Sequence, residues 1–166
     1  MGLCYLVPTR RRITGQTNYR MSETGHLIHL EFPSLVEMLD VVQAVVEQLG
    51  QLLCADDDAR HWVEVAVRES VTNAIKHGNH HDPAKTVEVD FTLTPAHEPC
   101  ELRVRVRDHG RGFDPQALPD PLAPENLLKS SGRGVFFMRS FMDDVRIEPA
   151  VGGGMVVYMV KRFKRT

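Results

Sequence analysis

Residues 68–82, RESVTNAIKHGNHHD, carry acidic, amide, lysine and histidine side chains on a stretch with helical spacing. Val67 and Val71 belong to an apolar stripe with a spacing of four residues, which a helix would bury. Glu69 and Asn73 are also four residues apart, and they lie about 200° around the helix from that stripe. They therefore either form an ordinary solvated i, i+4 pair or face something other than the core.

Several histidines lie at the end of the same stretch, and metal binding is one chemistry open to them. The candidate ligands are His77, His80, His81 and Asp82. They lie where the helix should end, which is a place where the helix dipole favours cationic residues. Because no other His or Cys cluster completes a site, we expect no zinc here and assign no role to His80 or His81.

The segment VRDHGRGFD contains an aspartate at an unusual place. Asp108 continues an alternating strand and has the same parity as the apolar residues of that strand, so its carboxylate points toward the expected core. A buried carboxylate requires hydrogen-bond donors, which are either local backbone and hydroxyl groups or an amine of a ligand. Gly110 and Gly112 would allow a flat ligand to approach the backbone closely.

A second glycine segment, Ser131-Gly132-Arg133-Gly134, comes just before a helix that we predict at about residues 134–142. Exposed amides at the start of a helix favour anions, especially phosphates, although glycines also serve plain turns. The loop between the two glycine segments is long for a compact domain, which is typical of a lid or a binding loop.

The elements that must position these residues follow a simple order. We expect a flexible N-terminal arm at residues 1–24 and one domain at residues 25–166. Within the domain we predict, in order, a strand at 26–33, a helix at 34–50 capped by Ser34, a helix at 57–77, strands at 86–93 and 101–108, the helix at 134–142, and two strands around a glycine turn. This order predicts an α+β, two-layer sandwich with helices on one face of a mostly antiparallel mixed sheet.

Composition limits the functional classes. The chain has 166 residues, 42% apolar and 25% charged, which suits one soluble domain. The formal net charge of -2 gives no indication of a nucleic-acid partner. No stretch is long and apolar enough to cross a membrane. The N-terminus lacks the pattern of a signal peptide. The three cysteines are widely spaced and odd in number, which argues against a disulfide framework and fits a reducing cytoplasm.

Taken together and in this order, the three motifs are much more specific than any one of them. E-x-x-x-N at residues 69–73, D-x-G-x-G at 108–112 and G-x-G at 132–134 resemble the ATP-binding domain shared by gyrase, histidine kinases and MutL, the GHKL superfamily with the Bergerat fold. The resemblance covers about residues 25–163. Within that superfamily, the segment PENLLKSSGRGVFFMRSFMDDV is most similar to the anti-sigma factor serine kinases.

This resemblance implies a set of nucleotide contacts. Asp108 would accept a hydrogen bond from the adenine amine of ATP, with Gly110 and Gly112 at the base pocket. Asn73 would offer its amide oxygen to Mg²⁺, a hard ion that prefers oxygen ligands. The amides of the segment Ser131, Gly132, Arg133 and Gly134 would contact the phosphates. Glu69 would be the general base that takes the proton of the attacking hydroxyl.

The resemblance also implies a function. The first interpretation is an ATP-dependent protein serine kinase and anti-sigma factor, which phosphorylates a STAS-type anti-anti-sigma protein, sequesters a sigma factor and forms a homodimer. The second is a binding module that uses ATP to select partners with negligible transfer; an intact Glu69 favours the first. The third is a stand-alone catalytic domain of a histidine kinase, which normally carries its phospho-accepting histidine on a long helix, whereas His26 and His29 lie in a predicted strand.

Overall fold

The computed structural model describes residues 26–52, 56–94, 100–112 and 130–163, with residues 130–133 described by their backbone. The predicted N-terminal arm and the long loop between the two glycine segments lie outside these ranges.

The strands form one open sheet. They are β1 (His26–Pro33), β2 (Thr86–Thr94), β3 (Cys100–Arg107), β4 (Asp144–Pro149) and β5 (Met155–Phe163). Their order in the five-stranded sheet is β1-β2-β3-β5-β4, and every neighbouring pair is antiparallel. The predicted strands are thus confirmed.

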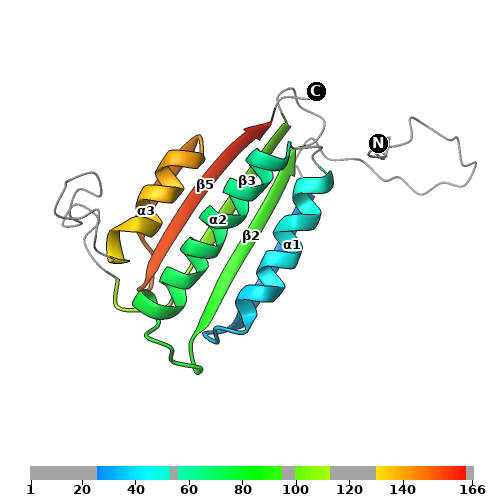
Figure 1. The fold of residues 1–166 in the computed structure, drawn as a ribbon. Coiled ribbons are helices and arrows are strands. Elements are labelled where there is room, and N and C mark those ends of the chain that lie inside the picture. The colour runs from blue at the N-terminus through cyan, green and yellow to red at the C-terminus, as the bar shows by residue number, and fades with distance from the viewer. Residues whose placement is uncertain (1–25, 53–55, 95–99, 113–129, 164–166) are drawn as a thin grey trace, which may run out of the picture.

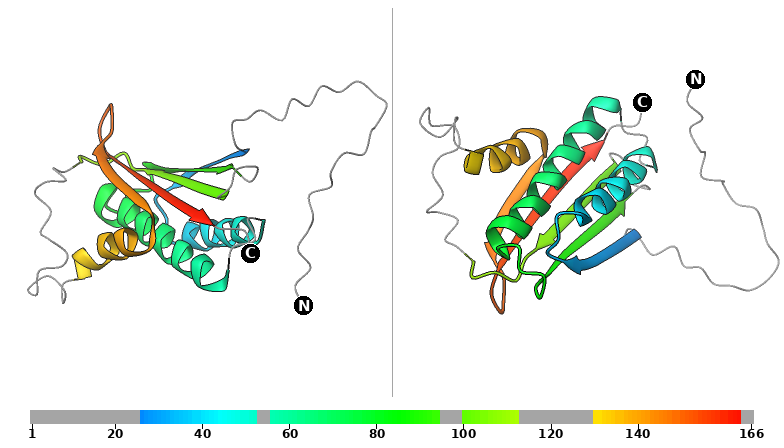
Figure 2. Two further views of the ribbon diagram at one scale, coloured as in Figure 1. Left: turned by 90° about the horizontal axis from the view of Figure 1, so that it is seen from above. Right: turned by 60° about the horizontal axis from the view of Figure 1, so that its bottom comes forward.

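The helices α1 (Met38–Leu52), α2 (Asp57–Asn73) and α3 (Ser130–Phe141) lie side by side on one face of the sheet (Figures 1 and 2). The central helix α2 runs over the middle of the sheet, with α1 on the side of β2 and α3 on the side of β5 (Figure 1). The predicted α+β two-layer sandwich is confirmed. None of the helices in the described ranges is long and apolar enough to span a membrane.

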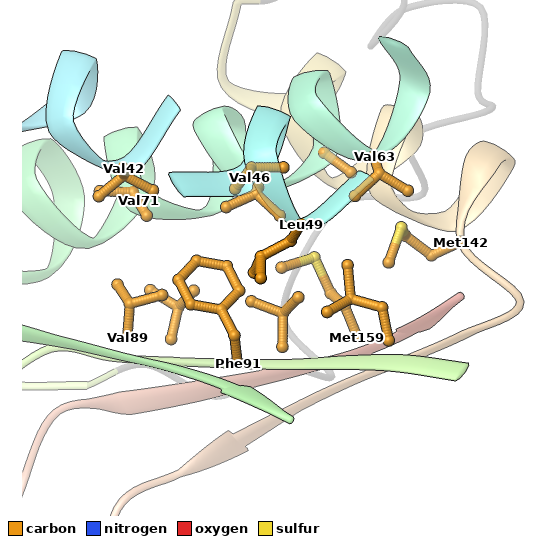
Figure 3. Close-up of a cluster of buried hydrophobic side chains, with 14 of the residues drawn as sticks. Val42, Val46, Leu49, Val63, Val71, Val89, Phe91, Met142 and Met159 are labelled. Carbon is orange, nitrogen blue, oxygen red and sulfur yellow. The ribbon is translucent and has the colours of Figure 1, made fainter. Parts of the chain in front are cut away.

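The core lies between the two layers because both contribute apolar faces with the expected period. Every second residue of β2 is buried, and Phe91 at its centre is fully enclosed. On the helix side, Val63 and Val71 of α2 point down to the sheet, and Val42 and Val46 of α1 do the same (Figure 3). Val67 of α2 is fully buried as well. The apolar stripe predicted from the sequence is therefore the buried side of α2.

The opposite face of the sheet is polar and carries the predicted cross-strand ion pairs. Asp90 of β2 lies opposite Arg105 of β3, and the two side chains are 2.6 Å apart. Arg105 also reaches Glu88 at 3.3 Å, and His29 of β1 bonds to Asp90 at 2.6 Å. Burial works against ionisation of Asp90, but the hydrogen bonds from His29 and Arg105 outweigh it and hold the pKa of Asp90 below its ordinary value.

The start of the first helix differs from the prediction. Ser34 is buried and donates its hydroxyl to the carbonyl of Lys85 at 3.1 Å, while α1 begins only at Met38. Ser34 is therefore an anchor between β1 and the segment before β2, and the expected capping box is wrong. A capping motif in sequence cannot reveal that the hydroxyl has a better partner fifty-one residues away.

Candidate functional site

A cavity of about 250 Å³ lies between the helices and the sheet where the predicted motifs come together. Asn73 and Asp108, which are distant in sequence, both line it. Ser70, His77 and Gly78 add further lining from the α2 side. The rest of its wall is apolar: Ala74, Val106, Val135, Met138, Ile147, Met155 and Val157. A concave, mostly apolar space with a few polar groups is typical of a site for a small organic ligand.

A larger groove, about 640 Å³, lies on the open face of the sheet. Its charged side chains are largely satisfied within the protein. Arg105 is paired with Asp90, Arg162 with Glu101 at 3.0 Å, and Arg146 with Asp144 at 3.5 Å. The smaller cavity is the better candidate because its polar groups are not used up in this way.

Asp108 is held in this cavity by backbone segments that pass very close to it. The carboxylate is only 5% exposed, and its Oδ1 accepts a hydrogen bond from the amide of Gly110 at 2.8 Å. A Cβ on Gly78 would lie 2.3 Å from Cγ of Asp108, and a Cβ on Gly154 would lie 2.0 Å from the carbonyl oxygen of Asp108. A side chain at either position is sterically excluded, so these glycines are required for Asp108 to sit here.

Gly110 and Gly112 have different positions relative to this carboxylate. A Cβ on Gly110 would lie 2.1 Å from the carbonyl oxygen of Gly78, so Gly110 belongs to the same close packing. Gly112 has a φ of +72° and lies near Gly154 and the sulfur of Met155. Met155 lines the cavity, whereas Gly112 itself is not among the lining residues. Gly110 does not line the cavity either, so both glycines act on the site through lining residues: Gly110 through Gly78 and Asp108, and Gly112 through Met155.

The electrostatics of Asp108 reflect this burial. Desolvation is the largest influence and raises the pKa of Asp108 above its ordinary value, although hydrogen bonds from the backbone of Gly110 and Met155 oppose the shift. A carboxylate that is costly to ionise in the free protein, and that faces a cavity, is a candidate functional group. The sequence-based prediction that Asp108 points toward the core is confirmed.

Glu69 and Asn73 lie beneath the beginning of α3. A Cβ on Gly134 would be 2.9 Å from Oε2 of Glu69 and 3.1 Å from Nδ2 of Asn73. The pair is therefore half-buried against α3 rather than an ordinary solvated face. Gly134 is therefore the point at which α3 meets the pair, and an added Cβ there would require the ends of these two side chains to shift.

The position of the second glycine segment corrects a prediction. Ser131, Gly132, Arg133 and Gly134 do not precede a helix but belong to the first turns of α3, which begins at Ser130. Gly134 of this segment packs against Glu69 and Asn73 of α2. Because only the first four N–H groups of a helix have no partner within it, the amides available to an anion are those at the very start of α3, and the amide of Gly134, the fifth residue of the helix, is not among them.

The other end of α3 is held against α2 by aromatic stacking. The rings of Trp62 and Phe141 are 3.6 Å apart between centroids and inclined by 8°. Phe137 stacks on Phe141 one turn earlier. The stack and Gly134 thus fix α3 along α2 at two points, which positions the first turn of α3 over Glu69 and Asn73.

The predicted helix at 57–77 ends in a way that the sequence did not indicate. After Asn73 the backbone widens into a π-helix, η1 (Ala74–Gly78), which places Ala74 and His77 in the cavity wall and Gly78 against Asp108. Single π-turns often occur at functional sites. His80 and His81 follow with φ of +56° and +58° and are exposed.

A buried residue that sequence reasoning missed, Asn79, connects the site to the rest of the sheet. Asn79 is 0% exposed, and its Oδ1 accepts a hydrogen bond from the amide of His109, next to Asp108, at 2.8 Å. Its Nδ2 donates to Oγ of Ser34 at 2.6 Å and to the carbonyl of Thr86 at 2.8 Å. The side-chain amide of Asn79 can both donate and accept, which is the chemistry needed to join several segments. Only the fold, however, brings its three partners together.

The histidines do not gather into a metal centre in the described ranges. His77 lines the cavity, whereas His80 and His81 point into solvent. No group of three or more His, Cys, Asp or Glu residues in these ranges is arranged to hold a metal ion. The expectation that these histidines bind no zinc stays a prediction.

Comparison with known proteins agrees with this geometry. The family model described as the histidine kinase-like ATPase domain matches residues 32–161, most of the chain. The chain belongs to the histidine kinase-like ATPase family. Within it, similarity is to the group of the anti-sigma factor serine kinases. The family membership predicted from the three motifs is thus confirmed.

Individual relatives support the same grouping. The chain is 33% identical over 141 residues to the anti-sigma F factor of Oceanobacillus iheyensis, covering 82% of this chain and 92% of that one. It is 32% identical over 140 residues to the anti-sigma F factor of Geobacillus stearothermophilus, with the same coverage. It is 24% identical over 152 residues to the serine-protein kinase RsbW of Staphylococcus epidermidis, covering 87% and 92%.

A solved structure shows the same fold. It contains the RsbU and RsbW domains of Rv1364c from Mycobacterium tuberculosis and superposes with a TM-score of 0.60 at 19% identity. The match covers 85% of this chain and 33% of that longer chain, so this chain spans about a third of it.

The raised pKa of Asp108 predicts how its removal affects stability. Asp108→Asn keeps an acceptor for Gly110 but removes a buried charge, so the variant should be more stable than the wild type at neutral pH. The pKa of Asp108 in the folded protein lies above its ordinary value of 3.8. The loss of stability caused by ionising this carboxyl is therefore absent below pH 3.8 and fully present above the raised pKa. Urea unfolding at about pH 3 and about pH 7 measures the difference.

Asp90→Asn is the matched control of opposite sign. The pKa of Asp90 is lowered, so its charge contributes stability that is present above the ordinary value of 3.8 and is lost as the pH falls through the lowered one. At neutral pH, Asp90→Asn should therefore destabilise the protein. If both variants move stability in the same direction, the account of Asp108 is wrong.

Asn79→Ala should destabilise the protein, because it removes the partners of the partly buried amide of His109 and carbonyl of Thr86. Each such group costs about 1–3 kcal/mol. Asn73→Ala is the control on the same stretch: Asn73 is half-buried, and its loss should change stability by less than about 0.5 kcal/mol. Equal losses for the two variants in denaturant unfolding would contradict this role of Asn79.

Proposed function

We propose that this chain is an ATP-dependent protein serine kinase and anti-sigma factor. It phosphorylates a small STAS-type anti-anti-sigma protein, sequesters a sigma factor, and acts as a homodimer in the cytoplasm. The single observation that carries the kinase is the position of Glu69 and Asn73, side by side under the first turn of α3 and next to the cavity of Asp108. The printed names of the relatives, anti-sigma F factor and serine-protein kinase, support the same function.

The residues present fit an adenine base. A carboxylate offers about four acceptor sites, and the backbone groups of Gly110 and Met155 use only part of this capacity. An exocyclic amine is a donor and matches what remains. The apolar wall around Val106, Met138 and Val157 suits the flat faces of a base.

The residues near α3 fit the phosphates and their ion. The amides in the first turn of α3 are available for anions, and the amide oxygen of Asn73 is a suitable ligand for Mg²⁺. When bound, ATP with Mg²⁺ supplies the phosphoryl group and neutralises its developing charge.

The chain's own residues then direct the transfer. Glu69 lies one turn from Asn73, so a base and a metal ligand address the same phosphate. Glu69 would accept the proton of the partner's serine hydroxyl as that oxygen bonds to the γ-phosphorus of ATP, while the bond from the γ-phosphorus to ADP breaks and ADP leaves. The start of α3 packs on both side chains at Gly134 and would help to keep water from the site.

A second function, an ATP-dependent partner switch with negligible transfer, is favoured by one observation. Gly134 lies so close to Oε2 of Glu69 that α3 covers the proposed base in this arrangement. A stand-alone histidine kinase catalytic domain is the weaker alternative: His26 and His29 lie on strand β1, and His29 is paired with Asp90.

Binding of ATP should depend on Asp108. Asp108→Asn presents an amide, which carries donors, where the adenine amine requires an acceptor. A buried mismatch of this kind costs about 1–3 kcal/mol, so affinity should fall by about tenfold to a hundredfold. Calorimetry with ATP and Mg²⁺ measures it, and unchanged affinity would refute the assignment of the base to Asp108.

Two variants on one helix separate the kinase from the switch. Glu69→Ala removes the base but keeps the base pocket and the amides of α3, so ATP affinity should stay near the wild-type value while transfer falls by about 10²–10⁴-fold. Asn73→Ala removes a metal ligand and should weaken both Mg²⁺-dependent binding and transfer.

The assay uses labelled ATP, the small partner that co-purifies with the protein, and mapping of the modified residue. A phosphoserine or phosphothreonine that depends on Glu69 supports the kinase. If the wild type and Glu69→Ala transfer equally poorly while ATP still changes partner affinity, the switch is correct instead.

A further inference from the structure

One buried hydroxyl in the cavity has no hydrogen-bond partner among the residues that the structure describes. Ser70 of α2 is 1% exposed, and its Oγ makes no hydrogen bond to any of the residues that the structure describes. A serine inside a helix commonly bonds back to the carbonyl four residues earlier, and Ser70 does not. Ser34, which is equally buried, bonds to both Asn79 and Lys85.

The position of Ser70 connects this hydroxyl to the proposed base pocket. Ser70, Asn73, Ala74 and His77 follow one another along the side of the α2–η1 helix that lines the cavity, and Asp108 lies in the same wall. The surroundings of Ser70 in the cavity are otherwise apolar, with Met138 from α3 and Val106 and Val157 from the sheet. A hydroxyl placed in such a wall costs folding free energy unless something in the cavity bonds to it.

We propose that Ser70 is a second residue that reads the purine base. Its Oγ–H donates a hydrogen bond, directly or through one bridging water, to a ring nitrogen of the base. This nitrogen is next to the amine whose hydrogen bond Asp108 accepts. The proposal rests on the proposed binding of ATP in this cavity. Asp108 requires a hydrogen-bond donor on the base, and Ser70 adds the requirement for a neighbouring acceptor. The base must therefore present an amine beside a ring nitrogen.

The donor and acceptor pattern makes this pair selective. In adenine, the amine is flanked by ring nitrogens that only accept, which matches a carboxylate beside a hydroxyl. A base with a carbonyl at that place would direct an acceptor at Asp108. Ser70 therefore contributes to choosing adenine nucleotides, whereas a purely structural serine would be indifferent to the base.

The first test is Ser70→Ala, which should move stability and affinity in opposite directions. Removing an unpaired buried hydroxyl should leave the free protein at least as stable as the wild type in urea unfolding. Affinity for ATP with Mg²⁺ should fall by about 2- to 10-fold in calorimetry, the effect of one hydrogen bond. Ser34→Ala is the matched control and should lose stability, because it breaks the bonds to Asn79 and Lys85.

The second test identifies the atom. Wild type and Ser70→Ala are titrated with ATP, 1-deaza-ATP and 7-deaza-ATP, each lacking one ring nitrogen next to the amine. The analogue that lacks the contacted nitrogen should bind the wild type more weakly than ATP does. Ser70→Ala should bind that analogue no more weakly than the wild type does. The proposal would be overturned if, for both analogues, the affinity loss from Ser70→Ala simply added to the loss from the missing nitrogen. It would also be overturned if Ser70→Ala bound ATP as tightly as the wild type does.

Asp108→Asn, measured alongside, separates this inference from the function on which it rests. If Asp108→Asn loses ATP binding but Ser70→Ala does not, the nucleotide site stands and the role of Ser70 is wrong. If the wild type binds no ATP, or Asp108→Asn binds it as well as the wild type, the base assignment fails and Ser70 fails with it.

Discussion

The buried carboxylate of Asp108 determines how closely separate segments of backbone must approach one another. Gly78 at the end of the π-helix, Gly110 after β3 and Gly154 before β5 each lie where a Cβ would collide with Asp108 or with a neighbouring carbonyl. The amide of Asp108 also donates to the carbonyl of Met155, which ties the end of β3 to the start of β5. One acidic side chain thus joins the helix layer to two neighbouring strands at the wall of the cavity.

The rest of the site follows from how α2 and α3 lie relative to that point. One side of α2 is buried on the sheet through valines such as Val63 and Val71, so its other, polar side must face away from the sheet (Figure 3). There it meets α3, which is held by Gly134 at one end and by the stack of Trp62 on Phe141 at the other. The family's ATP chemistry, proposed here for this chain, requires a carboxylate, an amide and free helix amides within reach of one another, and these two helices supply all three.

The sequence predicted most of the fold because its strands and helices obey simple periods. The alternation in residues 86–93 and 101–108 placed Phe91 and Val104 on the buried faces, as found, whereas the register that sets Asp90 opposite Arg105 came only from the structure. The alternation also placed Asp108 on the buried side, and that was enough to single it out. Glu69 and Asn73 were found from helical spacing alone, although their contact with α3 was not.

The errors have a common physical cause, which is that tertiary partners override local signals. Ser34 has the sequence of a helix cap but bonds to Lys85 instead, and Gly134 resembles a helix breaker but serves close packing inside α3. Asn79 and Ser70 carried no signal in the sequence, because an ordinary polar residue gains its role only from what the fold places next to it. The π-turn at Ala74–Gly78 could not be foreseen either, since it depends on Gly78 meeting Asp108.

The central claim is that Asp108 receives the base of an adenine nucleotide whose phosphates reach Glu69, Asn73 and the first turn of α3. A crystal structure of the protein with Mg²⁺ and a non-hydrolysable ATP analogue tests it most directly. The account predicts the exocyclic amine within about 3.2 Å of the Asp108 carboxylate and the ion bound by the amide oxygen of Asn73. An analogue bound elsewhere, or a base whose amine makes no contact with Asp108, would contradict it.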